Sequence, residues 1–163
     1  MVKPGCKLVM VTRSGSVKRT NVEDLNGRTE GNWAQVIGLE GSEDEVVIAG
    51  IASDEAQVIV ATAGSEASNA RALRFETKGI NPQVSPTARG VAALKMGDDP
   101  IIGGAIIEPS AQQGFALIVT EFAQIKRITL DEFPVQGRGG QGVQTWKLTK
   151  GSGVVSGFAV APS

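Results

Sequence analysis

Ala116-Leu-Ile-Val-Thr120 is a short apolar run that ends in a threonine, and the chain has two earlier copies of this pattern. The copies are Leu8-Val-Met-Val-Thr12 and Val58-Ile-Val-Ala-Thr62, so the three threonines lie 50 and 58 residues apart. A repeat of this length is typical of folds that are built from sheet-like blades. Such a fold presents similar side chains at regular intervals on one surface, and this arrangement suits a regularly charged ligand.

Three further strands are expected in each unit. Basic second strands follow at Val17-Lys-Arg-Thr20, Leu73-Arg-Phe75 and Ile125-Lys-Arg-Ile128. Third strands start at Gly90 and Gly142, each 17 residues after the start of the second strand, whereas the first unit has only Trp33-Ala-Gln-Val-Ile37. Fourth strands are expected at 46–49, 101–107 and 154–158. Short strands separated by Gly-rich and polar turns predict an all-β domain, with single helical turns at 22–25 and 130–133.

The predicted architecture is one domain of three four-stranded units. The units run from about 7 to 56, from 57 to 113 and from 114 to 162. Three blades leave unpaired sheet edges. We therefore expect either an open arc or a disc that is completed by a second copy of the chain.

The composition excludes most catalytic chemistry. The 163 residues include no histidine, no tyrosine and one cysteine, which rules out a histidine base, a tyrosyl nucleophile and a cysteine zinc cage. We therefore expect a binding protein rather than an enzyme, with no cofactor, no metal site and no small-molecule substrate. No apolar stretch approaches the roughly 20 residues of a membrane span, and no signal peptide is visible, so a cytoplasmic protein without a membrane partner is expected.

The second and third units resemble the C-terminal repeats of the A subunits of DNA gyrase and topoisomerase IV. The matching text is Leu117-Ile-Val-Thr-Glu-Phe-Ala-Gln-Ile-Lys-Arg-Ile128 with the following 130–143, and 72–75, 85–91 and 94–99 in the second unit. Met10-Val-Thr-Arg-Ser-Gly-Ser-Val-Lys-Arg-Thr20 is the matching text in the first unit. The resemblance implies a β-pinwheel whose blades exchange a strand, with a basic rim around which duplex DNA bends.

The resemblance also implies a DNA-wrapping box, which in gyrases reads Gln-Arg-Arg-Gly-Gly-Lys-Gly. Here Gln136, Arg138, Gly139, Gly140 and Gly142 match it, while Gly137 and Gln141 stand where the family has an arginine and a lysine. Two of the three box charges are therefore missing. Without the resemblance, the favoured interpretation of the segment 137–142 is only a tight turn between strands.

The predicted function is sequence-independent binding and bending of duplex DNA by a non-catalytic domain that contributes to DNA topology control. Lys and Arg neutralise phosphates, and glycines let backbone N–H groups approach them. The DNA-binding candidates are Lys18, Arg19, Arg28, Arg71, Arg74, Arg89, Lys126, Arg127, Gln136, Arg138, Gly139, Gly140, Gly142 and Lys147. The acidic residues fall mostly at 40–45, 54–55 and 98–99, which are expected on the opposite edge.

Two alternatives stay open on the sequence. The net charge of −1, from 16 basic and 17 acidic residues, and the incomplete box favour a protein-interaction pinwheel that has lost its DNA rim. Lys-Arg pairs on strands also protect sheet edges against aggregation without any ligand. The expected partners are therefore duplex DNA, a second copy of the chain, or one of the subunits of a topoisomerase.

Overall fold

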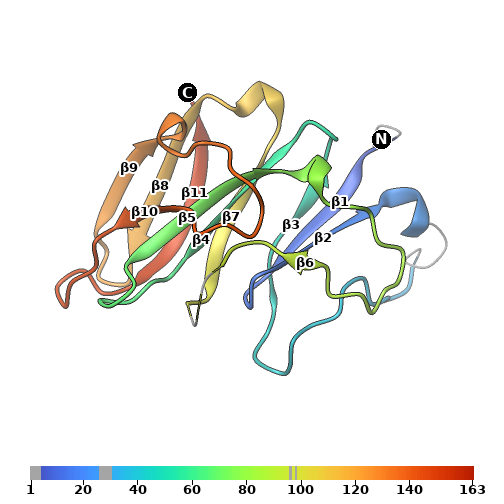
Figure 1. Ribbon diagram of the computed structural model, residues 1–163, viewed down its shortest axis with the longest axis horizontal. Coiled ribbons are helices and arrows are strands. Elements are labelled where there is room, and N and C mark those ends of the chain that lie inside the picture. The colour runs from blue at the N-terminus through green and yellow to red at the C-terminus, as the bar shows by residue number, and fades with distance from the viewer. Residues whose placement is uncertain (1–4, 26–30, 96, 98) are drawn as a thin grey trace.

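The computed structural model describes residues 5–25, 31–95, 97 and 99–163, and its three antiparallel sheets stand side by side in chain order (Figure 1). Blade 1 has the order β3 (Val46–Ala52), β1 (Lys7–Thr12), β2 (Ser16–Asn21), β6 (Val91–Ala92). Blade 2 has the order β10 (Val143–Trp146), β5 (Ala70–Glu76), β4 (Gln57–Thr62), β7 (Ile101–Ile107). Blade 3 has the order β11 (Val155–Pro162), β8 (Gly114–Thr120), β9 (Ile125–Thr129). The all-β prediction is confirmed.

The helices within the described residues are single 3-10 turns. They are η1 (Val22–Leu25), η2 (Thr77–Gly79), η3 (Pro109–Ala111) and η4 (Leu130–Glu132), of which η1 and η4 fall at the predicted positions. No described helix is long and apolar enough to cross a membrane.

The threonine that ends each apolar run fixes the turn that follows it. The hydroxyl of Thr12 accepts a hydrogen bond from the backbone N–H of Ser16, and that of Thr120 accepts one from Gln124, each at 3.2 Å. Thr62 accepts the same bond from Arg71 at 3.0 Å, although its hairpin loop is longer. A side-chain acceptor in a turn satisfies a backbone donor that the sheet ladder does not reach. The repeated threonine is therefore a structural feature of every hairpin.

The core lies between the blades rather than inside any one of them. One apolar cluster joins blade 1 to blade 2 and includes Val9, Val17, Val58 and Phe75. A second joins blade 2 to blade 3 and includes Ile59, Ile107, Ile118 and Phe133. Every residue of β4 is buried because blade 2 is covered on both faces, whereas burial in β8 alternates along the strand. Blade 3 therefore has one face without a neighbouring blade among the described residues.

Two strands cross from one unit to the sheet of the preceding unit. β6 belongs to the second unit but pairs with β2 in blade 1, and β10 belongs to the third unit but pairs with β5 in blade 2. This exchange is the pinwheel arrangement that the resemblance implied. Because of this exchange, a blade does not contain the same strands as one sequence unit. The predicted unit boundaries near residues 56 and 113 therefore stay a prediction.

The exchange explains where the strand prediction fails. Residues 33–37 form no strand, although a third strand was predicted there. In the other units this strand pairs with the preceding blade, and the described residues contain no blade before blade 1. Blade 3 likewise has three described strands instead of four, because its fourth would come from a following unit.

Candidate nucleic-acid interface

Residues 136–142, which we call the glycine box, join blades 1 and 2 through backbone hydrogen bonds. The N–H of Gly139 donates to the carbonyl of Ala93, and the N–H of Lys95 donates to the carbonyl of Gly140, both at 2.8 Å. The N–H of Gln136 donates to the carbonyl of Arg74 at 2.8 Å. The box thus ties β5 to the segment that follows β6.

This geometry changes the expected role of the box glycines. Gly139 and Gly140 were predicted to present their N–H groups to a phosphate, but both donate internally, the second to Gly137 at 3.3 Å. Gly142 has a φ of +71°, and a Cβ at this position would meet the carbonyl oxygen of Ala72. Glycine is therefore required there for close backbone approach. The tight-turn interpretation applies to these three residues, and DNA contact by them stays a prediction.

Three cationic side chains lie around the glycine box and the segment that it contacts. Arg138 is exposed and donates to the carbonyl of Ala92 at 2.7 Å, and Arg71 donates to the carbonyl of Lys95 at 3.3 Å. The Lys95 side chain is exposed, and Nε of Arg71 is buried without a hydrogen-bond partner among the described residues. We call Arg71, Lys95 and Arg138 the basic cluster.

The sequence prediction missed Lys95. Its signal was available, because Lys95 lies five residues after Gly90 and Lys147, which was predicted, lies five residues after Gly142. The two lysines therefore occupy matching places after the two exchanged strands.

Strand β10 connects the basic cluster to two further cations of the third unit, Lys126 and Lys147. Gln144 of β10 faces Arg71 in the strand register, and the amine of Lys126 donates to the carbonyl of Thr145 at 3.1 Å. Lys147 follows the end of the strand and is exposed. We call the basic cluster together with Lys126 and Lys147 the basic track.

The cations of the basic track have no carboxylate partner within the described part of the chain. The ion pairs found there hold other basic residues: Lys7 and Arg19 to Asp54, Arg13 to Glu45, and Lys78 to Glu76. Arg89 is also exposed and outside these pairs. The positive charge of the track is therefore not neutralised locally, even though the net charge of the chain is −1.

Arg127 points away from the track. Neighbouring residues of a strand project to opposite faces of the sheet. Lys126 reaches β10, whereas the guanidinium of Arg127 lies 4.7 Å from the ring centroid of Phe115 on the uncovered face of blade 3. Lys126 and Arg127 are both exposed but lie on opposite faces of blade 3, and DNA contact by either residue stays a prediction.

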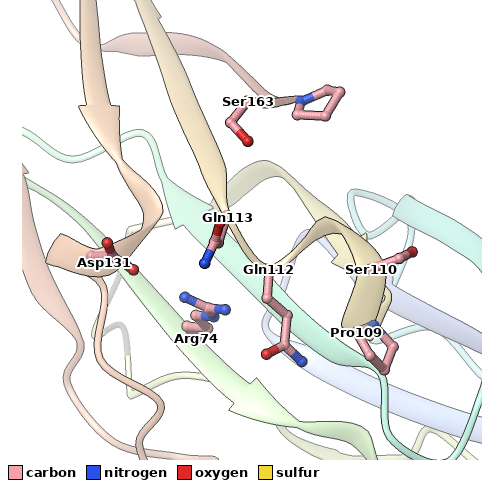
Figure 2. Close-up of a pocket in the computed structure, with 8 residues that line it drawn as sticks. Arg74, Pro109, Ser110, Gln112, Gln113, Asp131 and Ser163 are labelled. Atoms are coloured by element: carbon pink, nitrogen blue, oxygen red, sulfur yellow. The ribbon is translucent and has the colours of Figure 1, made fainter.

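Arg74 is buried, with 6% of its surface exposed, and it does not lie on a rim as predicted. Its guanidinium donates to Oε1 of Gln57 at 2.7 Å and to the carbonyl of Leu130 at 3.1 Å, so it joins blade 2 to η4. Burial lowers the pKa of Arg74, and the nearby charge of Asp131 opposes this effect. Arg74 lines a pocket of about 450 Å³. Figure 2 shows Asp131, Gln112 and Gln113 around the Arg74 side chain.

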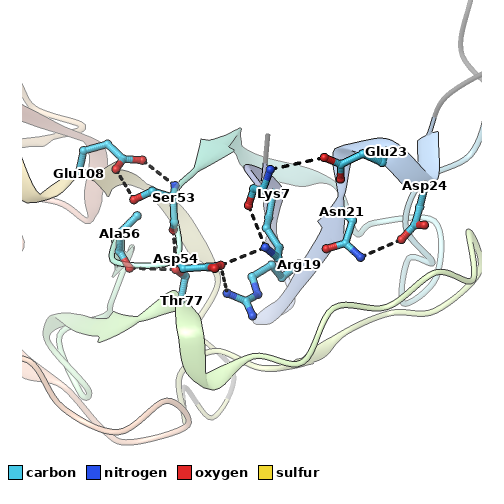
Figure 3. Close-up of polar contacts among 11 residues, drawn as sticks. Lys7, Arg19, Asn21, Glu23, Asp24, Ser53, Asp54, Ala56, Thr77 and Glu108 are labelled. Atoms are coloured by element: carbon cyan, nitrogen blue, oxygen red, sulfur yellow. Dashed lines mark hydrogen bonds and ion pairs between the residues drawn. The ribbon is translucent and has the colours of Figure 1, made fainter. Parts of the chain in front are cut away.

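Arg19 is also held inside the molecule, with 7% of its surface exposed. It pairs with Oδ1 of Asp54 at 3.2 Å, and the amine of Lys7 meets the same oxygen at 3.0 Å (Figure 3). The hydrogen bond and charge of Lys7, with a smaller contribution from Arg19, lower the pKa of Asp54. A second-strand cation therefore contacts an acidic turn, so the expected separation of basic and acidic edges fails here.

Lys18 is the most deeply buried of the predicted rim residues, at 1% exposure. Its amine donates to the carbonyls of Val36 and Ser85, each at 2.7 Å. Burial lowers the pKa of Lys18. Lys18, Arg19 and Arg74 thus serve internal contacts, and the prediction that they line an outer edge is wrong. Arg28 lies outside the described residues.

Comparison with known proteins identifies related domains. The family model described as DNA gyrase C-terminal domain, beta-propeller, matches residues 7–29 and 115–162. The DNA gyrase A protein of Deinococcus deserti is 29% identical over 154 residues, and that of Kosmotoga olearia is 34% identical over 155. These alignments cover 93% and 94% of this chain but only 18% of each relative. The chain thus spans less than a fifth of the length of these relatives.

Two solved structures share the fold. The C-terminal domain of DNA topoisomerase IV superposes with a TM-score of 0.81 at 24% identity, covering 96% of this chain and 46% of that domain. The DNA gyrase A C-terminal domain superposes with a TM-score of 0.77 at 22% identity, covering 99% of this chain and 50% of that domain. The predicted resemblance to the C-terminal repeats of the gyrase and topoisomerase IV proteins is therefore confirmed, in sequence by the family model and the gyrase A relatives and in fold by the two solved domains.

Proposed function

We propose that this domain binds duplex DNA without sequence preference and bends it, as a non-catalytic element of DNA topology control in the bacterial cytoplasm. The absence of histidine and tyrosine supports a role without catalysis. The gyrase A relatives suggest that the domain acts beside a topoisomerase core.

The observation that carries the proposal is the basic track. Five cations from two units follow the glycine box and β10, and they lie outside the ion pairs of the described residues. Uncompensated cations along one edge attract phosphates and displace counterions from the duplex. Binding through phosphates alone carries no base information, so the affinity is expected to be independent of sequence.

The test is a salt titration of binding to a short fluorescent duplex, measured by anisotropy. The double variant Lys95→Gln/Arg138→Gln removes two exposed cations of the track. Each phosphate contact contributes about 0.9 to the slope of log affinity against log salt, so the slope should fall in magnitude by roughly 1.8.

The matched control is Arg13→Gln/Lys78→Gln, which removes the same charge from two partly or fully exposed side chains that are already in ion pairs. Its salt slope should equal that of the unmodified chain. Affinity that does not depend on salt, or an equal loss in both double variants, would refute the track as the DNA-binding surface.

Bending is measured separately, by energy transfer between dyes at the two ends of the duplex. A bent duplex brings its ends closer, so transfer should rise when the domain binds. A duplex that binds with unchanged transfer would remove bending from the proposal and leave binding in place.

A protein-interaction pinwheel is the second candidate. It is favoured by the burial of Lys18, Arg19 and Arg74, which removes three cations from the predicted rim, and by Gly137 and Gln141 in the box. Pull-down from lysate with and without nuclease separates the two functions. Partners that survive nuclease treatment support the second candidate, and partners that are lost support DNA binding.

A further inference from the structure

Two arginines occupy equivalent places in blades 1 and 2. Arg19 of β2 faces Val9, and Arg74 of β5 faces Ile59. Val9 and Ile59 each lie three residues before the threonine that ends their apolar run. Both arginines are buried, and a buried cation needs opposite charge or hydrogen bonds around it. The two blades meet this need in different ways.

The turn that follows blade 1 supplies a carboxylate from the chain itself. Asp54 lies two residues after the end of β3, and its Oδ1 meets Arg19 at 3.2 Å and Lys7 at 3.0 Å. After blade 2, the place of Asp54 is taken by Pro109, two residues after the end of β7. Gln57 stands where blade 1 has Lys7, since both lie five residues before the threonine of their strand. The second turn therefore lacks the carboxylate that the first provides.

Arg74 has hydrogen bonds but no ion pair within the described part of the chain. Its Nε donates to Gln57 and its Nη1 to the carbonyl of Leu130. The remaining nitrogen, Nη2, donates to no described residue. Because Arg74 lines the pocket of about 450 Å³, this guanidinium has donor capacity left for a ligand there.

The same pocket holds a carboxylate and three neutral polar side chains. Asp131 forms no ion pair with a described residue, although its charge is close enough to raise the pKa of Arg74 against the effect of burial. The side chains of Ser110, Gln112 and Gln113 make no hydrogen bond to a described residue. Figure 2 shows Gln112, Gln113 and Asp131 around Arg74. The other lining residues are Pro109, Pro162 and Ser163. One charge of each sign is therefore available to a ligand.

We propose that this pocket binds a small zwitterion of the amino-acid class, with its carboxylate on Arg74 and its ammonium group on Asp131. Both contacts are charge-assisted hydrogen bonds, and the neutral side chains serve the remaining donors and acceptors. The ligand carboxylate would take the part that Asp54 plays beside Arg19. A ligand without net charge matches the pocket, whereas phosphate would bring excess negative charge near Asp131. The volume lies within the range of small-molecule sites, a class of ligand that the sequence did not predict.

The first experiment is proton–nitrogen correlation NMR of the labelled chain at neutral pH, with glycine, L-serine or L-glutamine added in steps. Saturable shifts are expected at the side-chain amides of Gln112 and Gln113 and at the Nε–H of Arg74. Acetate and methylammonium each carry only one of the two charges, so each should bind about tenfold more weakly or worse. The proposal is overturned if none of the three amino acids shifts these signals, or if acetate binds as tightly as glycine.

The second experiment repeats the titrations with Asp131→Asn. The affinity for glycine should fall about tenfold because the ammonium group loses its partner, while the affinity for acetate should rise because a repelling charge is gone. Glu132→Gln is the matched control, since Glu132 is the neighbouring exposed carboxylate of η4 and does not line the pocket. Equal losses in the two variants, or a fall in acetate affinity with Asp131→Asn, would refute the assignment. Thermal unfolding checks that both variants are folded. No residue of this pocket belongs to the basic track, so a negative result leaves the DNA-binding proposal in place.

Discussion

Substitution of Gly142 by alanine tests the strand exchange directly. A new Cβ would meet the carbonyl oxygen of Ala72, with the Ala72 carbonyl carbon at 2.8 Å and the Leu73 nitrogen at 3.2 Å. These are backbone atoms of β5, so they cannot move aside as a flexible side chain would. The left-handed φ of +71° adds a penalty of roughly 1–2 kcal/mol for a residue with a Cβ.

The overlap must be relieved by moving β10 away from β5. Val143 and Gln144 pair with Ala72 and Arg71 in this ladder, and each backbone hydrogen bond that is lost costs about 1 kcal/mol. Together with the backbone penalty, the expected loss is roughly 3 kcal/mol of unfolding free energy, which is large for a single substitution. Urea denaturation followed by circular dichroism measures it, with a lower midpoint and a similar slope expected.

Gly137→Ala is the matched control within the same box. Gly137 has no left-handed φ, and no described atom lies within 4 Å of its Cβ position, so its substitution should change stability by less than about 0.5 kcal/mol. If Gly142→Ala is as stable as Gly137→Ala, the close approach of β10 to β5 does not hold the blades together and the reasoning is wrong.

Two further predictions concern stability. The buried carboxylate of Asp44 accepts hydrogen bonds from the backbone N–H groups of Ser14, Glu40 and Glu45 and from the Ser14 hydroxyl. Burial alone would raise the pKa of Asp44, but these bonds outweigh it and lower the pKa. The stabilisation is therefore present above the ordinary pKa of about 4 and is lost as the pH falls through the lower folded value. Asp44→Asn should cost about 1–3 kcal/mol at neutral pH and make the acid loss of stability shallower in urea titrations at several pH values; an unchanged acid profile would contradict this. Phe133→Ala should cost about 3–5 kcal/mol in the same assay, because Phe133 is 2% exposed in the cluster between blades 2 and 3, and a loss below about 1 kcal/mol would show that this cluster does not join them.

The linear sequence determined the elements that depend on local chemistry. The apolar runs with their closing threonines, the basic second strands and the fourth strands are all present near the predicted residues. Each is fixed within a single hairpin or by alternation along one strand, as the Thr12, Thr62 and Thr120 bonds show. The sequence also drew attention to the glycine box, although the close packing of Gly142 against β5 became visible only in the structure.

Only the tertiary structure decided which cations reach solvent. Lys18 and Lys126 occupy equivalent positions in β2 and β9, yet Lys18 is buried against Val36 and Ser85 while Lys126 is exposed beside β10. Arg19 is buried beside Asp54, and Arg74 is buried beside Leu130 of the following unit. Arg127 is exposed on a face of blade 3 that no described blade covers. The repeat gives equivalent residues the same local backbone, but the exposure of a side chain depends on the neighbouring blade, and that neighbour is set by contacts between distant parts of the chain.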